Sequence, residues 1–225
     1  MANPSEAEFT QARLSMVELV QVYMQLSSTQ IDRDHLDRRV LSAMAEVPRH
    51  NFVPPELRHV AYADSPIPIG CDKTVSQPFM VALMTDLLDI EPGAKMLEIG
   101  TGLGYHAAIL AGLAETVFTV EIHEELAREA RARLEALGYD NISFKIGDGA
   151  QGWPQQAPFD RILVAAAPEL LPAALIQQLR PGGRMVVPAG LPDDQQLLVV
   201  DKLADGRITT REVLQVVFSP LIKSH

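Results

Sequence analysis

Three glycines at alternate positions, Gly100, Gly102 and Gly104, lie between two short apolar stretches. The stretch K-M-L-E-I ends at the first glycine, and Y-H-A-A-I-L follows the last one. This order predicts a strand, a tight loop and the start of a helix. Because glycine lacks Cβ, such a loop can adopt unusual backbone angles and let a ligand lie against the main chain. The chemistry indicated is the binding of a nucleotide-like cofactor.

The spacing of the glycines separates two classes of cofactor. Dinucleotide-binding folds use G-x-G-x-x-G, whereas here Tyr105 occupies the position of that third glycine. The pattern E-x-G-x-G-x-G is instead typical of class I methyltransferases that use S-adenosyl-L-methionine. A tight strand-to-helix turn without a ligand is the alternative. We predict that the cofactor site includes Glu98, Gly100, Thr101, Gly102 and Gly104.

Two acidic residues follow the next two apolar stretches. Glu121 ends an alternating run about 20 residues after the first glycine, where a carboxylate can accept hydrogen bonds from two ribose hydroxyls. It could also cap the helix expected over 123–137. Asp148 stands in a G-D-G turn after the stretch 141–146, where it could accept from an adenine amine or simply form a turn. The predicted cofactor contacts here are Glu121, Ile122, Asp148 and Gly149.

Composition restricts the classes of function. The chain has 225 residues, 47% hydrophobic, and 19 basic against 29 acidic side chains give a net charge of −10. That balance disfavours nucleic-acid partners. Cys71 is the only cysteine and no H-E-x-x-H run occurs, so neither a disulfide framework nor a metal site is expected. No apolar run reaches the roughly 18 residues of a membrane span, and the N-terminus lacks signal-peptide character, so we expect a cytoplasmic setting without a membrane partner.

The elements that must position these residues fall into two parts. Strands are expected at 95–100, 116–121, 141–146, 159–165 and 183–188, alternating with helices near 105–113, 123–137 and 172–179. The stretches 195–203 and 207–218 meet at a D-G turn and predict an antiparallel hairpin. The alternation predicts an α/β, Rossmann-like fold with a mostly parallel seven-stranded sheet and an antiparallel C-terminal hairpin.

The part before this core is expected to be helical. Helices are predicted over 9–26 and 36–46, with a short helical piece up to Tyr62, and a further helix over 79–88 opens the core. Between them, 64–78 holds three prolines and reads as a loop of functional length. We therefore expect one methyltransferase domain, 1–225, with an N-terminal helical extension and substrate loop (1–78) and a Rossmann-like core (79–225).

Further motifs resemble the protein-L-isoaspartate (D-aspartate) O-methyltransferase family. The run T-V-S-Q-P at 74–78, upstream of the glycine loop, is far more particular than the loop itself. The resemblance covers roughly 16–221. The other matches are V-P-R-H-x-F-V-P at 47–54, A-Y-x-D at 61–64, P-I-G at 68–70, L-E-I-G-T-G at 97–102, G-D-G at 147–149, F-D at 159–160, Q-L-x-P-G-G at 178–183 and P-L at 220–221.

This resemblance implies methylation of the free carboxylate of L-isoaspartyl residues in damaged proteins, after which the ester closes to a succinimide and repair begins. D-aspartyl residues are a further implied substrate. The implied cofactor is S-adenosyl-L-methionine, and the implied partners are isoaspartyl peptides or proteins. Ser76 is expected at the substrate carboxylate with Thr74 beside it, and Ala166, Ala167 and Ser219 at the peptide. An ST-turn or capping of the next helix is the alternative role for Ser76.

The chain departs from the family pattern G-x-G-Q-T, because it reads G-C-D-K-T at 70–74. Asp72 and Lys73 are either solvated or, if Lys73 points inward, suited to another substrate. His106 replaces a usual glutamine and is expected on the helix surface or at the methionine end of the cofactor. The departures keep two alternatives open: a specialised carboxyl or small-molecule methyltransferase, and a binding module that has lost transfer.

Overall fold

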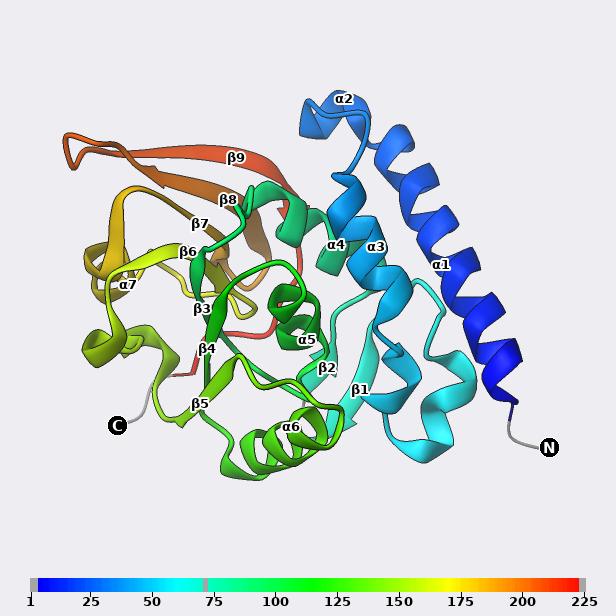
Figure 1. Cartoon of the computed structure of the whole chain (residues 1–225). Helices are drawn as coiled ribbons and strands as arrows, with labels where there is room; N and C mark the ends of the chain where they lie inside the picture. The colour runs from blue at the N-terminus through cyan, green and yellow to red at the C-terminus, as the bar shows by residue number, and fades with distance from the viewer. Residues whose placement is uncertain (1–3, 71–72, 223–225) are drawn as a thin grey trace.

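A seven-stranded sheet forms the centre of the computed structural model, which describes residues 4–70 and 73–222 (Figure 1). Its strand order is β5-β4-β3-β6-β7-β8-β9. The first five of these strands pair in parallel, while β8 is antiparallel to β7 and β9 to β8, as predicted. The bounds are β3 (Lys95–Ile99), β4 (Thr116–Glu121), β5 (Ile142–Ile146), β6 (Phe159–Val164), β7 (Leu179–Leu191), β8 (Asp194–Lys202) and β9 (Ile208–Val216).

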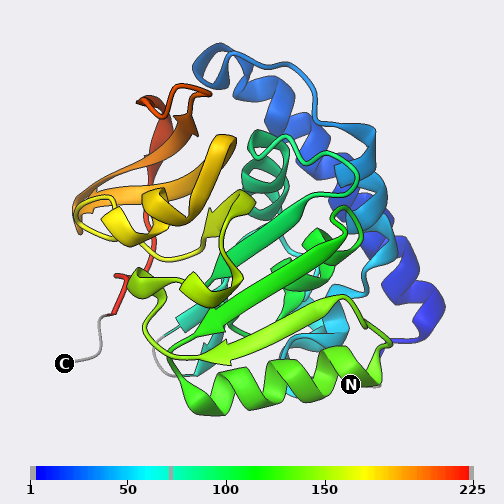
Figure 2. The same ribbon diagram turned by 60° about the vertical axis from the view of Figure 1, so that its left-hand side comes forward.

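Helices cover both faces of this sheet, and α1 is the outermost one in both views (Figures 1 and 2). It packs on α3 and α4, as the amphipathic pattern of the N-terminal part requires. The helices are α1 (Glu6–Leu26), α2 (Ser28–Ile31), α3 (Arg38–Glu46), α4 (Pro78–Leu87), α5 (Tyr105–Ala111), α6 (Glu124–Ala136) and α7 (Ala173–Gln178). Short 3₁₀ turns are η1 (Arg49–Asn51), η2 (Pro55–Val60), η3 (Gly149–Gln151) and η4 (Pro154–Gln156).

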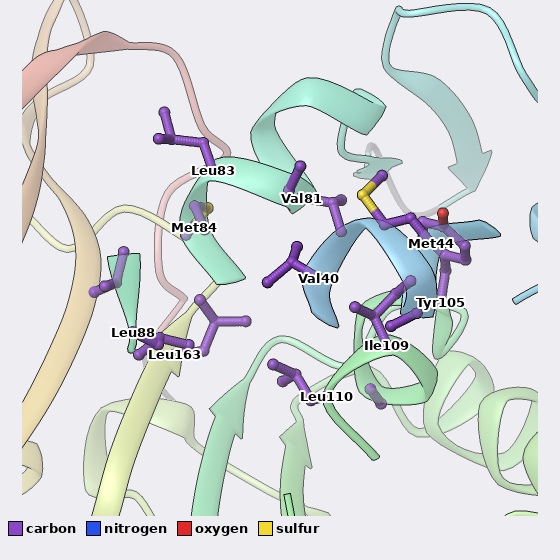
Figure 3. Close-up of a cluster of buried hydrophobic side chains, with 14 of the residues drawn as sticks. Val40, Met44, Val81, Leu83, Met84, Leu88, Tyr105, Ile109, Leu110 and Leu163 are labelled. Carbon is purple, nitrogen blue, oxygen red and sulfur yellow. The ribbon is translucent and has the colours of Figure 1, made fainter. Parts of the chain in front are cut away.

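Alternation along the strands divides the core between the two faces of the sheet. Met96 and Leu163 face the larger cluster, which α3, α4, α5 and α6 cover, whereas Leu97 and Ile162 face the smaller cluster with α7. Figure 3 shows part of the larger cluster, in which side chains of α3, α4 and α5 interleave over the sheet. Full burial of each large aliphatic side chain contributes about 1.5–3 kcal/mol. This packing fixes α4 and α5, the two helices that follow the predicted substrate and cofactor loops.

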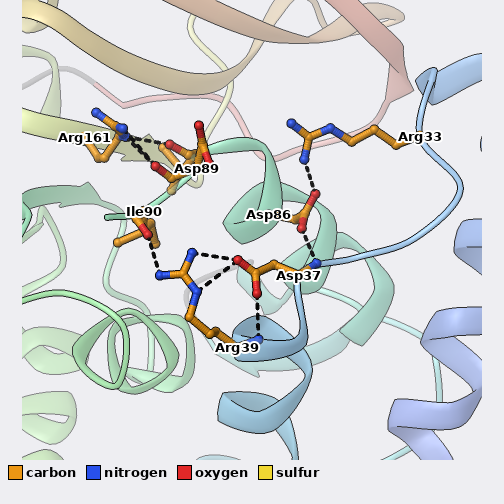
Figure 4. A network of polar contacts seen from close by, with 8 residues as sticks. Arg33, Asp37, Arg39, Asp86, Asp89, Ile90 and Arg161 are labelled. Carbon is orange, nitrogen blue, oxygen red and sulfur yellow. Dashed lines mark hydrogen bonds and ion pairs between the residues drawn. The ribbon is translucent and has the colours of Figure 1, made fainter. Parts of the chain in front are cut away.

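A polar network at the far end of α4 ties that helix to the sheet (Figure 4). The buried carboxylate of Asp86 pairs with Arg33 at 2.5 Å and accepts the Asp37 N–H at 2.7 Å. Arg161 of β6 donates to the Asp89 carbonyl at 2.8 Å. Because buried polar groups must find partners, these contacts fix the helix end against β6.

The structure differs from expectation in the segment 64–78. The predicted loop contains a two-stranded antiparallel hairpin, β1 (Ile67–Gly70) with β2 (Lys73–Val75). Its strands are too short and too interrupted by proline for a period to be read, yet Ile67 and Ile69 are buried on one side. Across the described ranges, no helix has the length and apolar character that crossing a membrane demands.

Candidate active site

A cavity of about 890 Å³ opens at the carboxyl ends of β3, β4 and β6. Ligands of parallel α/β sheets bind at this edge. One wall comes from the glycine loop and the end of β4, and the opposite wall from the β1–β2 hairpin and the segment after β9. Of the predicted site residues, the following line it: Thr74, Ser76, Gly100, Gly102, Glu121, Ile122, Gly149, Ala166 and Ser219.

The glycine loop adopts backbone angles that residues with a side chain rarely adopt. Gly100, Gly102 and Gly104 have φ of +91°, +54° and +90°. A Cβ at Gly104 would lie 2.8 Å from Leu134 Cδ1 of α6, which is too close. Gly104 therefore serves the packing of the loop on α6 and is not among the residues that line the cavity, whereas Gly100 and Gly102 are.

The carboxylate of Glu121 braces the loop against the start of α6. Its Oε2 accepts the Gly102 N–H at 2.9 Å, and its Oε1 accepts the His123 N–H at 3.0 Å. The N-cap residue of α6 is His123, so Glu121 does not occupy the capping position; it accepts the N–H that precedes the helix and also lines the cavity. An anion fixed by two N–H groups, at the edge of a cavity, is placed to accept hydrogen bonds from a ligand's hydroxyls.

Glu98 lies beneath the loop instead of at the cavity. It is fully buried, and its Oε2 accepts from Thr119 Oγ1 at 2.6 Å, which in turn lies 2.5 Å from Thr101 Oγ1. Burial raises the pKa of Glu98 to about 8, and the nearby charge of Glu121 adds to the rise against the Thr119 hydrogen bond. Neither Glu98 nor Thr101 is among the residues that line the cavity, so their link to a ligand would pass through the loop they support.

The G-D-G turn delivers its second glycine to the cavity. Asp148 accepts the Ala150 N–H at 2.8 Å and is the N-cap of η3, which is the turn-forming role weighed for it. Gly149 lines the cavity and packs so tightly on Ile99 that a Cβ has no room. Asp148 itself is not among the lining residues.

The cavity wall opposite the glycine loop is fixed by residues that do not themselves line the cavity. Ser76 lines the cavity and its carbonyl accepts from Arg49 Nη2 at 2.8 Å. Helix α4 has Gln77 at its N-cap without a side-chain bond, so the capping role weighed for Ser76 is wrong. Asp64 caps the start of α4 instead, because its Oδ1 accepts the Phe79 N–H at 2.9 Å. Lys73 also lines the cavity, while Cys71 and Asp72 lie outside the described residues.

The segment after β9 closes the third side. Ala167 donates to the Ser219 carbonyl at 2.8 Å, and its own carbonyl accepts the Leu221 N–H at 2.8 Å. Ser219 and Ala166 face the cavity, but Ala167 is not among its lining residues. Sequence reasoning missed several apolar residues that line the cavity from α6 and from the segment after β9: Leu126, Val217, Phe218, Leu221 and Ile222.

The expectation for His106 was wrong. Its side chain is buried, not on the helix surface, and Nε2 lies 2.9 Å from Thr85 Oγ1 of α4. Burial, with a smaller effect of the Arg49 charge, lowers its pKa to about 3, so the imidazole is neutral. The histidine links α5 to α4 and is not among the residues that line the cavity.

Similarity to known proteins shows the family of this chain. The family model for protein-L-isoaspartate(D-aspartate) O-methyltransferase (PCMT) matches residues 23–225. This chain belongs to that family. The protein-L-isoaspartate O-methyltransferase 1 of Polaromonas sp. is 54% identical over 217 residues, covering 96% of this chain and 92% of the relative. A protein-L-isoaspartate O-methyltransferase 2 of Nitrosococcus oceani is 52% identical over 195 residues, which are 87% of this chain and 89% of the relative.

Solved structures agree with this membership of the PCMT family. A protein-L-isoaspartate O-methyltransferase that is 26% identical superposes with a TM-score of 0.78 over 92% of this chain and 65% of that chain. A Plasmodium falciparum protein, solved with S-adenosyl-L-homocysteine, shares the fold at 23% identity with a TM-score of 0.78, over 94% of this chain and 99% of that one. The chain is thus a class I methyltransferase of the PCMT family, an enzyme whose cofactor is S-adenosyl-L-methionine.

Proposed function

We propose that this chain methylates the free carboxylate of L-isoaspartyl residues in damaged proteins and so initiates their repair through a succinimide. The observation that carries the proposal is one cavity with two unlike walls. Glu121 and the glycine loop form the wall suited to the cofactor, and Ser76 stands on the wall suited to the acceptor. Membership of the PCMT family supplies the reaction.

The residues present fit S-adenosyl-L-methionine. The Glu121 carboxylate faces the cavity, as two ribose hydroxyls require, and Gly102 lets a ligand approach the main chain. Ile122 and Leu126 provide apolar surface for a purine ring. The cavity volume of about 890 Å³ is that of a site for a ligand of this size. When bound, the cofactor supplies a methyl group on a positively charged sulfur.

The acceptor side is suited to an anion that is losing its charge. A carboxylate is ionised at neutral pH, so no base has to remove a proton. Since its charge disappears as the new C–O bond forms, a strong cation would stabilise the bound substrate more than the transition state. The Ser76 and Thr74 hydroxyls are neutral donors, and we propose that they hold the carboxylate, with Ala166 and Ser219 along the peptide and Ala167 behind them, where it donates to the Ser219 carbonyl.

The departure at Lys73 does not favour a different enzyme. Curated relatives about half identical to this chain carry the isoaspartyl name over nearly its whole length. We also propose that D-aspartyl residues are accepted, because the family description includes them. The cytoplasm remains the proposed compartment, and the net charge of −10 supports peptide over nucleic-acid substrates.

A paired-peptide assay tests this function. The protein is incubated with methyl-labelled cofactor and an isoaspartyl peptide, beside the same peptide with normal aspartate. We expect base-labile label on the isoaspartyl peptide alone, followed by conversion of part of it to the aspartyl form. Equal labelling, or none, would refute the proposal, whereas tight S-adenosyl-L-homocysteine binding without turnover would identify a binding module.

A further inference from the structure

Arg49 is a buried cation at the junction of three segments. Its side chain has no exposed surface. Its Nε donates to the Ala61 carbonyl at 2.8 Å, and its Nη2 donates to the Ser76 carbonyl at 2.8 Å. The guanidinium carbon lies 4.6 Å from the centre of the Tyr105 ring, within the range of a cation–π contact.

Two of these partners lie at or next to the two walls of the cavity. Ser76 is on the acceptor wall, and Tyr105 is the first residue of α5, directly after Gly104 of the cofactor loop. The Tyr105 side chain is buried in the cluster of Figure 3, so packing holds it in place. The Arg49 side chain therefore connects the ring of Tyr105, next to the cofactor loop, with the main chain of Ser76 on the acceptor wall.

Keeping a guanidinium here is costly. Burial lowers the pKa of Arg49, and within the described part of the chain no carboxylate pairs with it. Carbonyl oxygens and a ring compensate a buried charge less well than an ion pair does, and apolar side chains of similar size often stabilise more. Stability alone is thus a poor explanation for this residue, whereas its rigid, planar fork of donors suits the fixing of two carbonyls at set positions.

We propose that Arg49 is a positioning residue that sets the place of Ser76 relative to the cofactor loop. The inference rests on the proposed function, because it concerns the alignment of acceptor oxygen and methyl group. Such alignment is sensitive: a displacement of about 1 Å can cost about 100-fold in rate. Arg49 touches neither reactant in this role and acts through the Ser76 main chain.

The test compares Arg49→Lys with Arg161→Lys. Arg161 is a matched control, since it is also buried and donates to three carbonyls, those of Leu88, Asp89 and Asp160, at 2.6, 2.8 and 3.0 Å. It does not line the cavity. Lysine keeps the charge in both variants but cannot span two carbonyls. Readouts are melting temperature, S-adenosyl-L-homocysteine affinity, and kcat and KM with an isoaspartyl peptide.

We expect both variants to lose stability, but only Arg49→Lys to lose kcat, by about 10-fold to 100-fold, with S-adenosyl-L-homocysteine affinity within about twofold of wild type. Should Arg49→Lys fail to fold, Tyr105→Leu, which removes the ring beneath the guanidinium, must lower kcat in the same way. Unchanged kcat in the folded variant, or an equal fall in Arg161→Lys, would overturn the inference. An inactive wild type would instead refute the proposed function, so the two failures are distinguishable.

Discussion

Glu121 Oε2 accepts the Gly102 N–H at 2.9 Å, so the acid that ends β4 is bonded to the loop that follows β3. The same carboxylate lines the cavity. Glu121 therefore both fixes the loop and faces the cavity. The pairing of β3 with β4, in register from Lys95 with Thr116 to Ile99 with Val120, brings the two chain segments together.

Replacing Glu121 with glutamine should weaken cofactor binding more than turnover. The amide has one acceptor oxygen and so can serve only one of the Gly102 and His123 N–H groups, and it loses the charge that strengthens hydrogen bonds to two ribose hydroxyls, each worth about 1.5–3 kcal/mol. We expect the Kd for S-adenosyl-L-homocysteine, measured by calorimetry, to rise about 10-fold to 100-fold. The kcat at saturating cofactor should change little, and an unchanged Kd would contradict the assignment.

The buried acid Glu98 should make stability depend on pH. Its folded pKa of about 8 lies above the ordinary glutamate pKa of 4.5, so between these values the folded state holds a proton that the unfolded state has released. Stability should therefore fall as pH rises from 4.5 to about 8, by up to about 1.4 kcal/mol per pH unit. Below pH 4.5 both states are protonated, and this residue contributes no slope.

Urea unfolding of wild type and Glu98→Gln across this range measures the effect. The glutamine variant keeps the size of the side chain but cannot titrate, so its slope between pH 5 and 8 should be less negative than that of wild type. Parallel stability curves for the two proteins would show that Glu98 is already ionised in the fold.

Gly104→Ala should cost stability through packing. Its Cβ would meet Leu134 at 2.8 Å in a backbone with φ of +90°. Gly138 is a matched control, since its φ is +85° but nothing lies within 4 Å of its Cβ position. We expect Gly104→Ala to lose about 1–3 kcal/mol of unfolding free energy more than Gly138→Ala. Equal losses would mean that α6 moves to make room.

Much of the fold was predictable because its signals are local. The three glycines and the acids after two strands lie at one edge of a parallel sheet by topology alone, which is why Gly102, Glu121 and Gly149 meet in one cavity. Ser76 could be placed only by family resemblance, since its support comes from Arg49, 27 positions away along the chain. The periodicity of the sequence does not predict a contact between residues so far apart along the chain.

Three features that the sequence did not show have local causes in the fold: tertiary packing, strand alternation and strand length. His106 stands in an apolar helix, and a polar residue there reads as a surface position until Thr85 of a different helix supplies its partner. Glu98 reads as part of the ligand motif, but the strand alternation turns its side chain under the loop, toward Thr119. The β1–β2 hairpin was missed because its strands have four and three residues, too few for a period to show.

Lys73 should bias the enzyme toward acidic peptides. It lines the cavity from β2, and among the described residues no acid forms an ion pair with it. Lys73→Gln should lower kcat/KM for a glutamate-flanked isoaspartyl peptide about threefold to fivefold, a surface-charge effect that salt should weaken. A lysine-flanked peptide should gain or stay the same.

The control for this change is Arg207→Gln. Arg207 is exposed beside Asp205, at the end of β9 that is far from the cavity. Its replacement by glutamine therefore removes one positive charge, as Lys73→Gln does, but away from the site. Identical peptide selectivity in wild type and Lys73→Gln, or an equal shift in Arg207→Gln, would exclude a local role for the lysine.

Ser76→Ala tests whether this serine holds the acceptor and not the cofactor, and Ser143→Ala, on the exposed side of β5 and away from the cavity, is its control. The measurement is kcat/KM for an isoaspartyl peptide together with the Kd for S-adenosyl-L-homocysteine. We predict a fall in kcat/KM of about 10-fold to 100-fold, the loss of one hydrogen bond to a charged group, with an unchanged Kd and no effect of Ser143→Ala. Undiminished kcat/KM, or a Kd that weakens in step with it, would contradict an acceptor site at Ser76.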